Sequence, residues 1–477
     1  MPIGAEPLPQ NAGSEVLELP SQPVSPIDLA GALALAGVRN PELFVARQRV
    51  VEAAALRQFA AVQILPNLNV GFNYNDHTGA IQQSSGNVIE LHRQALYVGA
   101  GANAVGAGTV NVPGLQYNVN VSQGIYNYLT ARQSVRTQQL NSVAAQNDVL
   151  LRVALAYLEL LRAECQRAIA FQVRTDAAEL ARLTGNFAET GEGRRSDADR
   201  AGTEFAQRES ELLDRDAQVL IASARLAQLL NLDPSIRLHA IDGWVVPAPI
   251  VPEPISLAEL VSVAIVSRPE LSAQRSAVQE TLLSLEAART LPFSPTVMIG
   301  LSAGGFGGGS NRQDLGAQSN FSSLDGRTDF DAVMFWTLQN LGFGNAAQID
   351  AARARVSANS YQQIAVLDRV RFEVAAAHAR THARFAQLSN AERAVAAASD
   401  AFREDFTRIR AREGLPIEVL DSLRLLGRSR TEYLNTIIDY NRAHFELYTA
   451  LGQPPAQMSA RPVPTELVAP ATPAVAP

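Results

Sequence analysis

Residues 255–280 read ISLAELVSVAIVSRPELSAQRSAVQE, and residues 27–52 read IDLAGALALAGVRNPELFVARQRVVE. The two stretches align without a gap, and the triplet Pro-Glu-Leu stands at the same place in both. Each is followed by a helical pattern and then by an alternating segment, at residues 65–74 in the first copy and 291–302 in the second. A repeat of this length is more than one turn of a solenoid, whose units run ~20–50 residues. It indicates a duplicated half-protein, and this duplication decides the fold.

The later part of each half repeats more faintly, with one constant spacing between the paired positions. The pairs are Val153 with Val374, Glu192 with Glu413, Gly193 with Gly414, and Pro234 with Pro455. We therefore predict two structural repeats, at residues 27–234 and 255–455, joined by a proline-rich linker at 235–254. The non-periodic ends, residues 1–26 and 456–477, are predicted to be disordered tails.

The composition argues against several classes of protein. Charged residues make up 18% and apolar residues 47% of the chain, which suits helices packed through small side chains. The net charge of −7 argues against a nucleic-acid partner, because such proteins carry basic patches. No apolar run is long enough for a transmembrane helix. Cys165 is the only cysteine, so no internal disulfide forms, and the first ten residues lack the features of a secretory signal. If the protein is exported, we expect this sequence to be mature-like, truncated or assigned a late start.

Alternation with a period of two predicts four β-strands, two in each half. They are expected at residues 68–74, 115–122, 296–302 and 329–337. The Gly-, Ser- and Asn-rich segment at 75–113 is predicted to be loop with one strand-like piece at 95–102. The Gly-rich segment at 304–309 is predicted to be a hairpin loop, because neither Gly-rich segment has the ending of a phosphate-binding loop.

A very long helical pattern follows each pair of strands. Residues 128–187 contain no proline, and sixty helical residues span roughly 90 Å. The helix is expected to turn at 190–193 and return to 230, and its copy to run over 346–412, turn at 413–416 and return to 451. Coiled-coil spacing predicts a buried seam between the two arms of the first hairpin. Its residues are Leu150, Val153, Tyr157 and Leu160 on the first arm, and Leu212, Val219, Ala222, Leu226 and Leu229 on the returning arm.

The two-faced strands favour a wall between lipid and water. Only helices and closed barrels span a bilayer, and four strands are too few to close. The barrel must therefore be shared between chains. The aromatic residues Phe72, Tyr74, Tyr97, Tyr117 and Trp336 fit either a girdle at the membrane interface or ordinary strand packing.

This arrangement resembles the TolC-like outer-membrane efflux protein family over residues 27–455. The resemblance rests on NPEL and RPEL, LPNLNVG, the turn sequences EGRRSDADRA and EGLPIEVLDS, and the helix endings LLNLDP and LGQPP. It implies a mainly α fold with a transmembrane β portion, assembled as a homotrimer with a shared twelve-stranded β-barrel and a periplasmic α-barrel tunnel. It also implies an exit duct for efflux or type I secretion. The expected partners are outer-membrane lipid, a periplasmic adaptor and an inner-membrane transporter, with no cofactor.

The resemblance also places the channel gate at the tips of the helical hairpins. Glu418 and Asp421 match the luminal acids of the family, and Asp197 and Arg200 hold the corresponding places in the first hairpin. Residues expected at the tips, in contact with the adaptor, are Gly193, Gly414, Leu415 and Pro416. The second tip is about two residues shorter than the family's pattern, which leaves the gate contacts open. The alternative is that these charges are ordinary solvated helix residues.

The sequence gives little support for metal binding or for enzymatic catalysis. His378 and His382 are four apart on a helix, which makes half a metal site, but a solvated face is the favoured interpretation. No nucleophile–base arrangement indicates an enzyme.

The rival hypotheses are a structural or adhesive periplasmic coiled-coil protein without a pore, and a periplasmic adaptor. An adaptor usually has one helical hairpin rather than two copies, and the structural rival leaves the two-faced strands unexplained. Neither the transported substrate nor the type of partner pump can be read from the sequence.

Overall fold

The computed structural model describes residues 24–102, 111–252, 255–311 and 324–453. Its α-helices come in two series with nearly equal lengths. The first is α1 (Leu29–Arg39), α2 (Pro41–Val62), α3 (Val121–Glu189) and α4 (Arg195–Leu229). The second is α5 (Leu257–Ser267), α6 (Pro269–Thr290), α7 (Phe343–Arg410) and α8 (Pro416–Ala450). Strands lie between the second and third helix of each series, so the same order of elements occurs twice.

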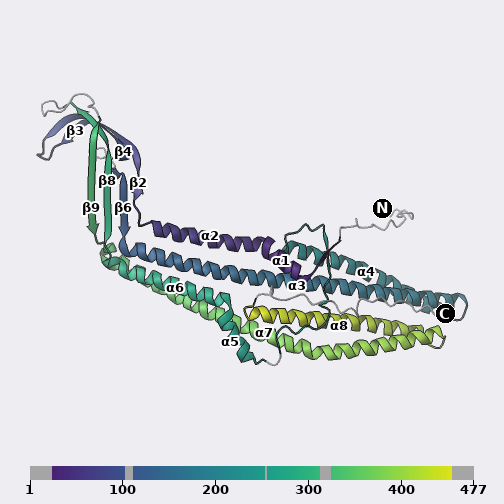
Figure 1. Cartoon of the computed structure of the whole chain (residues 1–477). Helices are drawn as coiled ribbons and strands as arrows, with labels where there is room; N and C mark the ends of the chain where they lie inside the picture. The colour runs from purple at the N-terminus through teal and green to yellow at the C-terminus, as the bar shows by residue number, and fades with distance from the viewer. Residues whose placement is uncertain (1–23, 103–110, 253–254, 312–323, 454–477) are drawn as a thin grey trace, which may run out of the picture. The chain divides into compact units, whose positions relative to one another are not determined.

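The elements form two compact units, labelled by their helices and strands in Figure 1. Of the described residues, the helical unit contains 24–46, 142–252, 255–269 and 367–453. The sheet unit contains 47–102, 111–141, 270–311 and 324–366. Each unit therefore draws on both halves of the sequence. The boundaries expected for the two repeats remain a prediction, because these units follow a different division.

The helical unit is held together by the predicted seam between α3 and α4. Seven of its nine predicted residues are at most 8% exposed: Leu150, Val153, Tyr157, Leu160, Val219, Ala222 and Leu226. Leu212 and Leu229 are only half-buried. Ile438 and Phe445 of α8 join the same hydrophobic cluster. Burying one such side chain stabilises the fold by roughly 1.5–3 kcal/mol, so this cluster is the main source of packing energy in the unit. The coiled-coil prediction is confirmed at these seven positions, whereas Leu212 and Leu229 are less buried than it predicted.

The segment expected to be a simple linker is packed into this unit. β7 (Arg237–Ala240) pairs in parallel with β1 (Val24–Ile27). Farther along, Trp244 is 3% exposed and its ring meets that of Phe445, with centroids 5.4 Å apart. The side-chain amide of Asn441 donates to the carbonyl oxygens of Trp244 and Val246 at 2.7 and 3.0 Å, and its oxygen accepts the Ala248 N–H at 2.9 Å. A buried amide on α8 thus satisfies the backbone of a proline-rich segment.

The sheet unit contains one antiparallel sheet of seven strands, and six of them lie in four lanes, that is, four side-by-side positions across the sheet. The strands are β2 (Asn67–Leu68), β3 (Val70–Gln82), β4 (Val88–Ala102), β5 (Val112–Pro113), β6 (Leu115–Asn120), β8 (Thr296–Ser310) and β9 (Asp325–Phe335). β2 and β3 form the first lane, which pairs with β6 and β4 in the second. β8 is the third lane because it pairs with both β4 and β6, and β9 is the fourth. The expected four strand positions per chain are thus present.

The strands are longer than their sequence pattern predicted. Much of the expected loop at 75–113 is the paired hairpin β3–β4, and the Gly-rich segment at 304–309 lies inside β8. The reason is the ring of Tyr97, which is fully buried against β8. A Cβ on Gly304 would lie 2.4 Å from the Val98 carbonyl oxygen and 2.9 Å from the Tyr97 ring. Glycine at position 304 therefore lets β4 approach β8 closely inside the sheet, and it does not mark a turn.

The first long helix also begins earlier than predicted. α3 starts at Val121, whereas the sequence pattern extended the strand to residue 122 and began the helix near 128. The side-chain oxygen of Asn120 accepts the Gln123 N–H at 3.1 Å. This is an N-cap contact, which satisfies a free donor at the start of the helix.

At residues 70–74 of β3 and 96–100 of β4, the sheet has one apolar and one polar face. Pairing of Phe72 with Val98 puts both on the apolar face, and pairing of Asn73 with Tyr97 puts both on the other. Tyr97 therefore lies on the opposite face from Phe72 and Tyr74, and its burial agrees with strand packing, one of the two alternatives given for the aromatic residues. Phe72 is 75% exposed. None of the described helices combines the length and the apolar character needed to cross a bilayer.

Two lanes are edges of this sheet. Within the described residues, β3 pairs only with β4, and β9 pairs only with β8. These edge strands have 13 and 11 residues, so each leaves a long row of backbone groups open on one side.

Leu226→Ala tests the seam of the helical unit. Leu226 is 0% exposed within the main cluster, so the cavity should lower the free energy of unfolding by about 2–5 kcal/mol. Leu213→Ala is the matched control, because Leu213 is on the same helix and 67% exposed; it should cost less than about 0.5 kcal/mol. Denaturant unfolding in detergent measures both, and equal losses would contradict the assigned seam.

Candidate functional site: the hairpin turns and the groove between α4 and α8

The two helical hairpins end in turns of the same geometry. Gly191 and Arg412 both adopt the left-handed conformation, with φ of 78° and 63°. The next residue of each turn donates its N–H to a carbonyl five residues back, Glu192 to Phe187 and Glu413 to Arg408, both at 2.9 Å. This is the hydrogen bond of a Schellman helix end. Arginine is costly at such a position, since left-handed backbone disfavours any side chain by about 1–2 kcal/mol.

The predicted tip residues occupy these turns. A Cβ on Gly193 would lie 2.9 Å from the Phe187 Cβ, and one on Gly414 would lie 3.1 Å from the Ile409 nitrogen. Both glycines therefore permit the chain to fold back tightly. Leu415 is the N-cap residue of α8 and is 60% exposed, and Pro416 is the first residue of the helix. Proline is tolerated there because its missing N–H would have no helical partner.

The predicted gate acids lie at the start of α8. Glu418 accepts the Leu415 N–H at 3.3 Å, which caps the helix, and its carboxylate lies 3.9 Å from the Arg408 guanidinium. The Leu415 side chain has no acceptor, so only this half of a capping box is formed. The Asp421 side chain is 71% exposed and lies 3.8 Å from Arg424. Each acid thus has an arginine nearby.

In the first hairpin, Asp197 and Arg200 form an ion pair of 3.5 Å along α4. Among the described residues, no hydrogen bond or ion pair joins this pair to Glu418 or Asp421. The turns themselves are bridged by a residue that the sequence analysis missed. Arg412 donates to Glu192 at 2.8 Å, and its guanidinium carbon lies 5.9 Å from the centre of the Phe187 ring.

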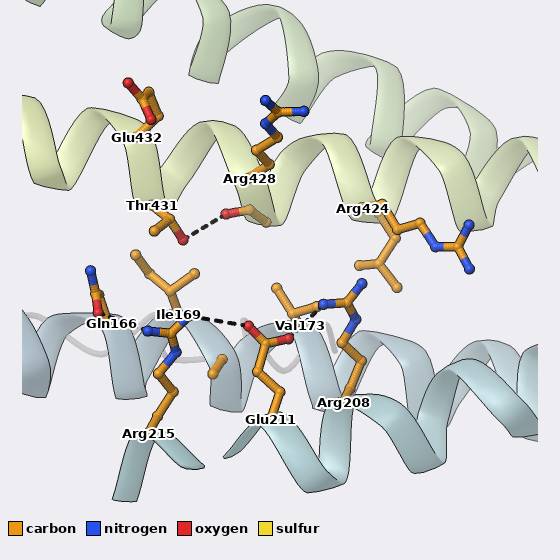
Figure 2. A pocket seen from close by; sticks show the side chains of 13 residues that line it. Gln166, Ile169, Val173, Arg208, Glu211, Arg215, Arg424, Arg428, Thr431 and Glu432 are labelled. Carbon is orange, nitrogen blue, oxygen red and sulfur yellow. Dashed lines mark hydrogen bonds and ion pairs between the residues drawn. The ribbon is translucent and has the colours of Figure 1, made fainter. Parts of the chain in front are cut away.

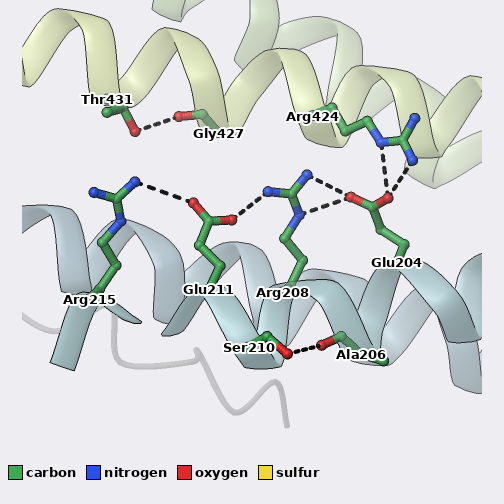
Figure 3. Close-up of polar contacts among 9 residues, drawn as sticks. All are labelled: Glu204, Ala206, Arg208, Ser210, Glu211, Arg215, Arg424, Gly427 and Thr431. Carbon is green, nitrogen blue, oxygen red and sulfur yellow. Dashed lines mark hydrogen bonds and ion pairs between the residues drawn. The ribbon is translucent and has the colours of Figure 1, made fainter. Parts of the chain in front are cut away.

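A series of ion pairs joins the hairpins farther from the turns (Figure 3). Glu204 of α4 is 1% exposed and accepts hydrogen bonds from Arg208 at 2.7–2.8 Å and from Arg424 of α8 at 2.5–2.9 Å. Arg208 also donates to Glu211 at 2.5 Å, and Glu211 lies 3.5 Å from Arg215. We call Glu204, Arg208, Glu211, Arg215 and Arg424 the arginine ladder.

The arginine ladder keeps a buried carboxylate charged. Burial by itself raises the pKa of Glu204, but the hydrogen bonds from Arg424 and Arg208 outweigh it, so the pKa lies below its ordinary value. Two arginines on one carboxylate also offset its loss of hydration. Glu204 is therefore an ionic contact between α4 and α8.

A pocket of about 310 Å³ lies beside the ladder (Figure 2). It is lined by Arg208, Glu211 and Arg215 from α4, by apolar Ile169 and Val173 from α3, and by six residues of α8. These six are Leu423, Arg424, Gly427, Arg428, Thr431 and Glu432. Close packing at one side depends on Gly427, where a Cβ would lie 3.1 Å from Val173. The pocket is thus a groove between two hairpins with an apolar floor and charged walls.

Sequence reasoning missed this groove, although one signal was present. Residues 204, 208, 211 and 215 alternate in charge at steps of four, three and four, which places them on one face of α4. Such a pattern normally indicates a solvated face, and only the packing of α8 makes it buried. Among the described residues, no group of three or more His, Cys, Asp or Glu side chains is arranged to hold a metal ion.

No protein-family model and no curated protein matches the chain. Solved structures do match its fold. The Campylobacter jejuni CmeC outer membrane channel aligns with a TM-score of 0.72 and 14% identity, covering 89% of this chain and 85% of that one. The outer membrane protein VceC of Vibrio cholerae gives 0.68 and 17%, covering 89% and 96%. The open-state MtrE outer membrane channel of Neisseria gonorrhoeae gives 0.65 and 20%, covering 89% of each chain.

The chain therefore has the fold of outer-membrane channel proteins. Within that class, it has the TolC-like fold that its repeated motifs predicted, and the resemblance is confirmed at the level of the fold.

Glu204→Gln tests the arginine ladder through pH. Because the folded pKa is lowered, the carboxylate contributes stability that is complete above about pH 4.5 and is lost as the pH falls through the folded value. The variant should lose about 3 kcal/mol at neutral pH and fall less steeply below about pH 4.5.

Glu209→Gln is the matched control, because the Glu209 side chain is 53% exposed in its pair with Arg174. It should cost less than about 1 kcal/mol and keep the wild-type pH slope. Unfolding followed between about pH 3 and 7 compares the three proteins. An unchanged slope in Glu204→Gln would show that the Glu204 carboxyl does not supply this stability.

Proposed function

We propose that the protein is an outer-membrane exit duct, which passively conducts substrates from a periplasmic pump assembly to the exterior. The observation that supports this most is the sheet, with its exposed apolar face and its two open edges, on a fold shared with outer-membrane channels. An apolar outer face and a polar inner face are what a barrel wall between lipid and water requires.

The open edges support assembly as a homotrimer. The lanes of the sheet alternate in direction, so β3 of one copy can pair antiparallel with β9 of the next. Such a head-to-tail contact repeats until the ring closes. Three copies supply twelve lanes, an even number within the range of bacterial membrane barrels. The helical units of the three copies then form the periplasmic tunnel.

The hairpin turns are the proposed gate and docking end. Three copies of Glu418 and Asp421 would surround the narrow end with carboxylates, and rings of acids favour cations. Leu415 and Ile417 are 60% and 40% exposed, and together with Gly193, Gly414 and Pro416 they offer a partly apolar surface to a periplasmic adaptor. That adaptor would connect the duct to an inner-membrane transporter, in a tripartite efflux or type I secretion system.

Planar-bilayer recordings test the duct and its gate together. The wild-type protein should form cation-selective channels that multivalent cations block. Glu418→Ser combined with Asp421→Ser should reduce both properties, because the ring loses its charge. Glu209→Ser removes an exposed acid of α4 away from the turns and should change neither.

The outcomes separate the two parts of the proposal. If no channel forms, the structural coiled-coil alternative is favoured over the duct. Channels whose selectivity and block are unchanged in the double variant would place the constriction away from Glu418 and Asp421.

A further inference from the structure

Three histidines meet in the helical unit at a place that the proposed duct does not use. His378 and His382 lie one turn apart on α7, and their Nε2 atoms are 3.1 Å from each other. The rings meet edge to face, with centroids 4.4 Å apart and planes at 69°. A solvated face is the interpretation that the sequence favours for this pair, and the structure adds a small, partly open cavity beside it.

The geometry of the pair suits two ligands of one metal ion. At a metal–nitrogen distance of about 2.05 Å, nitrogens 3.1 Å apart subtend an angle of about 98° at the metal. A tetrahedral pair needs about 109°, and neighbouring ligands in square-planar or octahedral sites need about 90°. The pair lies between these values, so small ring rotations would reach either geometry.

The cavity supplies a second, independent observation. It measures about 20 Å³ and is lined by His378, His382, Thr381, Val251, Leu447 and His444 of α8. This volume accommodates one water-sized occupant. His444 is 1% exposed, and its Nε2 has no hydrogen-bond partner among the described residues.

The protonation state of His444 decides whether its Nε2 atom is a hydrogen-bond donor or an acceptor. Burial lowers the pKa of His444 to about 4, so the ring is neutral at neutral pH. Its Nδ1 accepts the Val251 N–H at 3.4 Å, so the hydrogen of the neutral ring is on Nε2. An N–H donor is therefore buried without a hydrogen-bond acceptor among the described residues, on a side chain that lines the cavity.

We propose that His378 and His382 bind one divalent transition-metal ion through their Nε2 atoms, with a metal-bound water in the cavity that accepts the His444 Nε2–H. Imidazole nitrogens suit Cu²⁺, Ni²⁺ and Zn²⁺. Within the described residues no third His, Cys, Asp or Glu joins the pair as a ligand. This site is independent of the proposed conduction through the duct.

Calorimetric titration of the intact protein in detergent with Ni²⁺ tests the site. We expect one ion per chain, and a loss of affinity of at least about tenfold in both His378→Ala and His382→Ala. His92→Ala removes an exposed histidine that contacts Asp76 at 3.0 Å, and it should bind as the wild type does. Equal affinity in all four proteins would overturn the proposal.

A register variant controls for the number of histidines. His382→Ala combined with Ala379→His keeps six histidines but puts two next to each other, on different faces of the helix. Its affinity should fall as far as that of His382→Ala alone, whereas wild-type affinity would mean that any two nearby histidines suffice.

The role of His444 is tested separately. His444→Leu cannot donate to the bound water and should weaken Ni²⁺ binding by about tenfold or more, with the fold checked by circular dichroism. His444→Gln keeps an N–H donor and should retain more of the affinity than the leucine variant. Wild-type binding in His444→Leu would overturn the role given to this residue.

Discussion

Unpaired backbone groups at the two edges of the sheet are the constraint on which the proposed assembly depends. β3 and β9 are long, and each is paired on one side only within the described chain. Soluble proteins shorten, charge or cover such edges, because open N–H and C=O groups recruit other strands. Inside a bilayer the demand is stricter, since no water is present to satisfy them. A sheet with exposed Phe72 and Phe330 on its apolar face therefore fits lipid only if its edges close on other copies of the chain.

The helical unit meets a different constraint, because its long helices have water available and are stabilised by side chains. The side chains of the seam around Tyr157 and Leu226 are buried and apolar. Hydrophobic attraction has no preferred direction, so it holds the helices together without fixing which residues face each other. Directional contacts add that specificity. Glu204 joins α4 to α8 through the arginine ladder, and Arg412 joins the two turns through Glu192. A left-handed arginine is a strained choice, and such strain is commonly found at functional sites. Its place at the turns agrees with the proposal that this end docks a partner.

Much of the fold could be predicted because duplication and long periodic patterns carry strong signals. The repeated Pro-Glu-Leu motif led to two series of helices, and coiled-coil spacing identified Leu226 as buried. The ends of the strands could not be predicted, since glycine indicates a loop unless a neighbour such as Tyr97 is known to need the space. Burial of Glu204 was equally hidden, because charge at helical spacing looks the same on a solvated face and under a second helix. The turns were located by motif, but their role as a gate depends on an assembly that one chain does not contain.

The central claim is that this chain completes its sheet with two further copies, and the mass of the purified particle tests it most directly. Light scattering or native mass spectrometry in detergent measures the number of chains per particle. The account predicts three chains, because three four-lane sheets close a twelve-lane barrel. It also predicts that the particle needs detergent to stay soluble, since the apolar face remains outside. A stable monomer that is soluble in water without detergent would contradict the shared barrel.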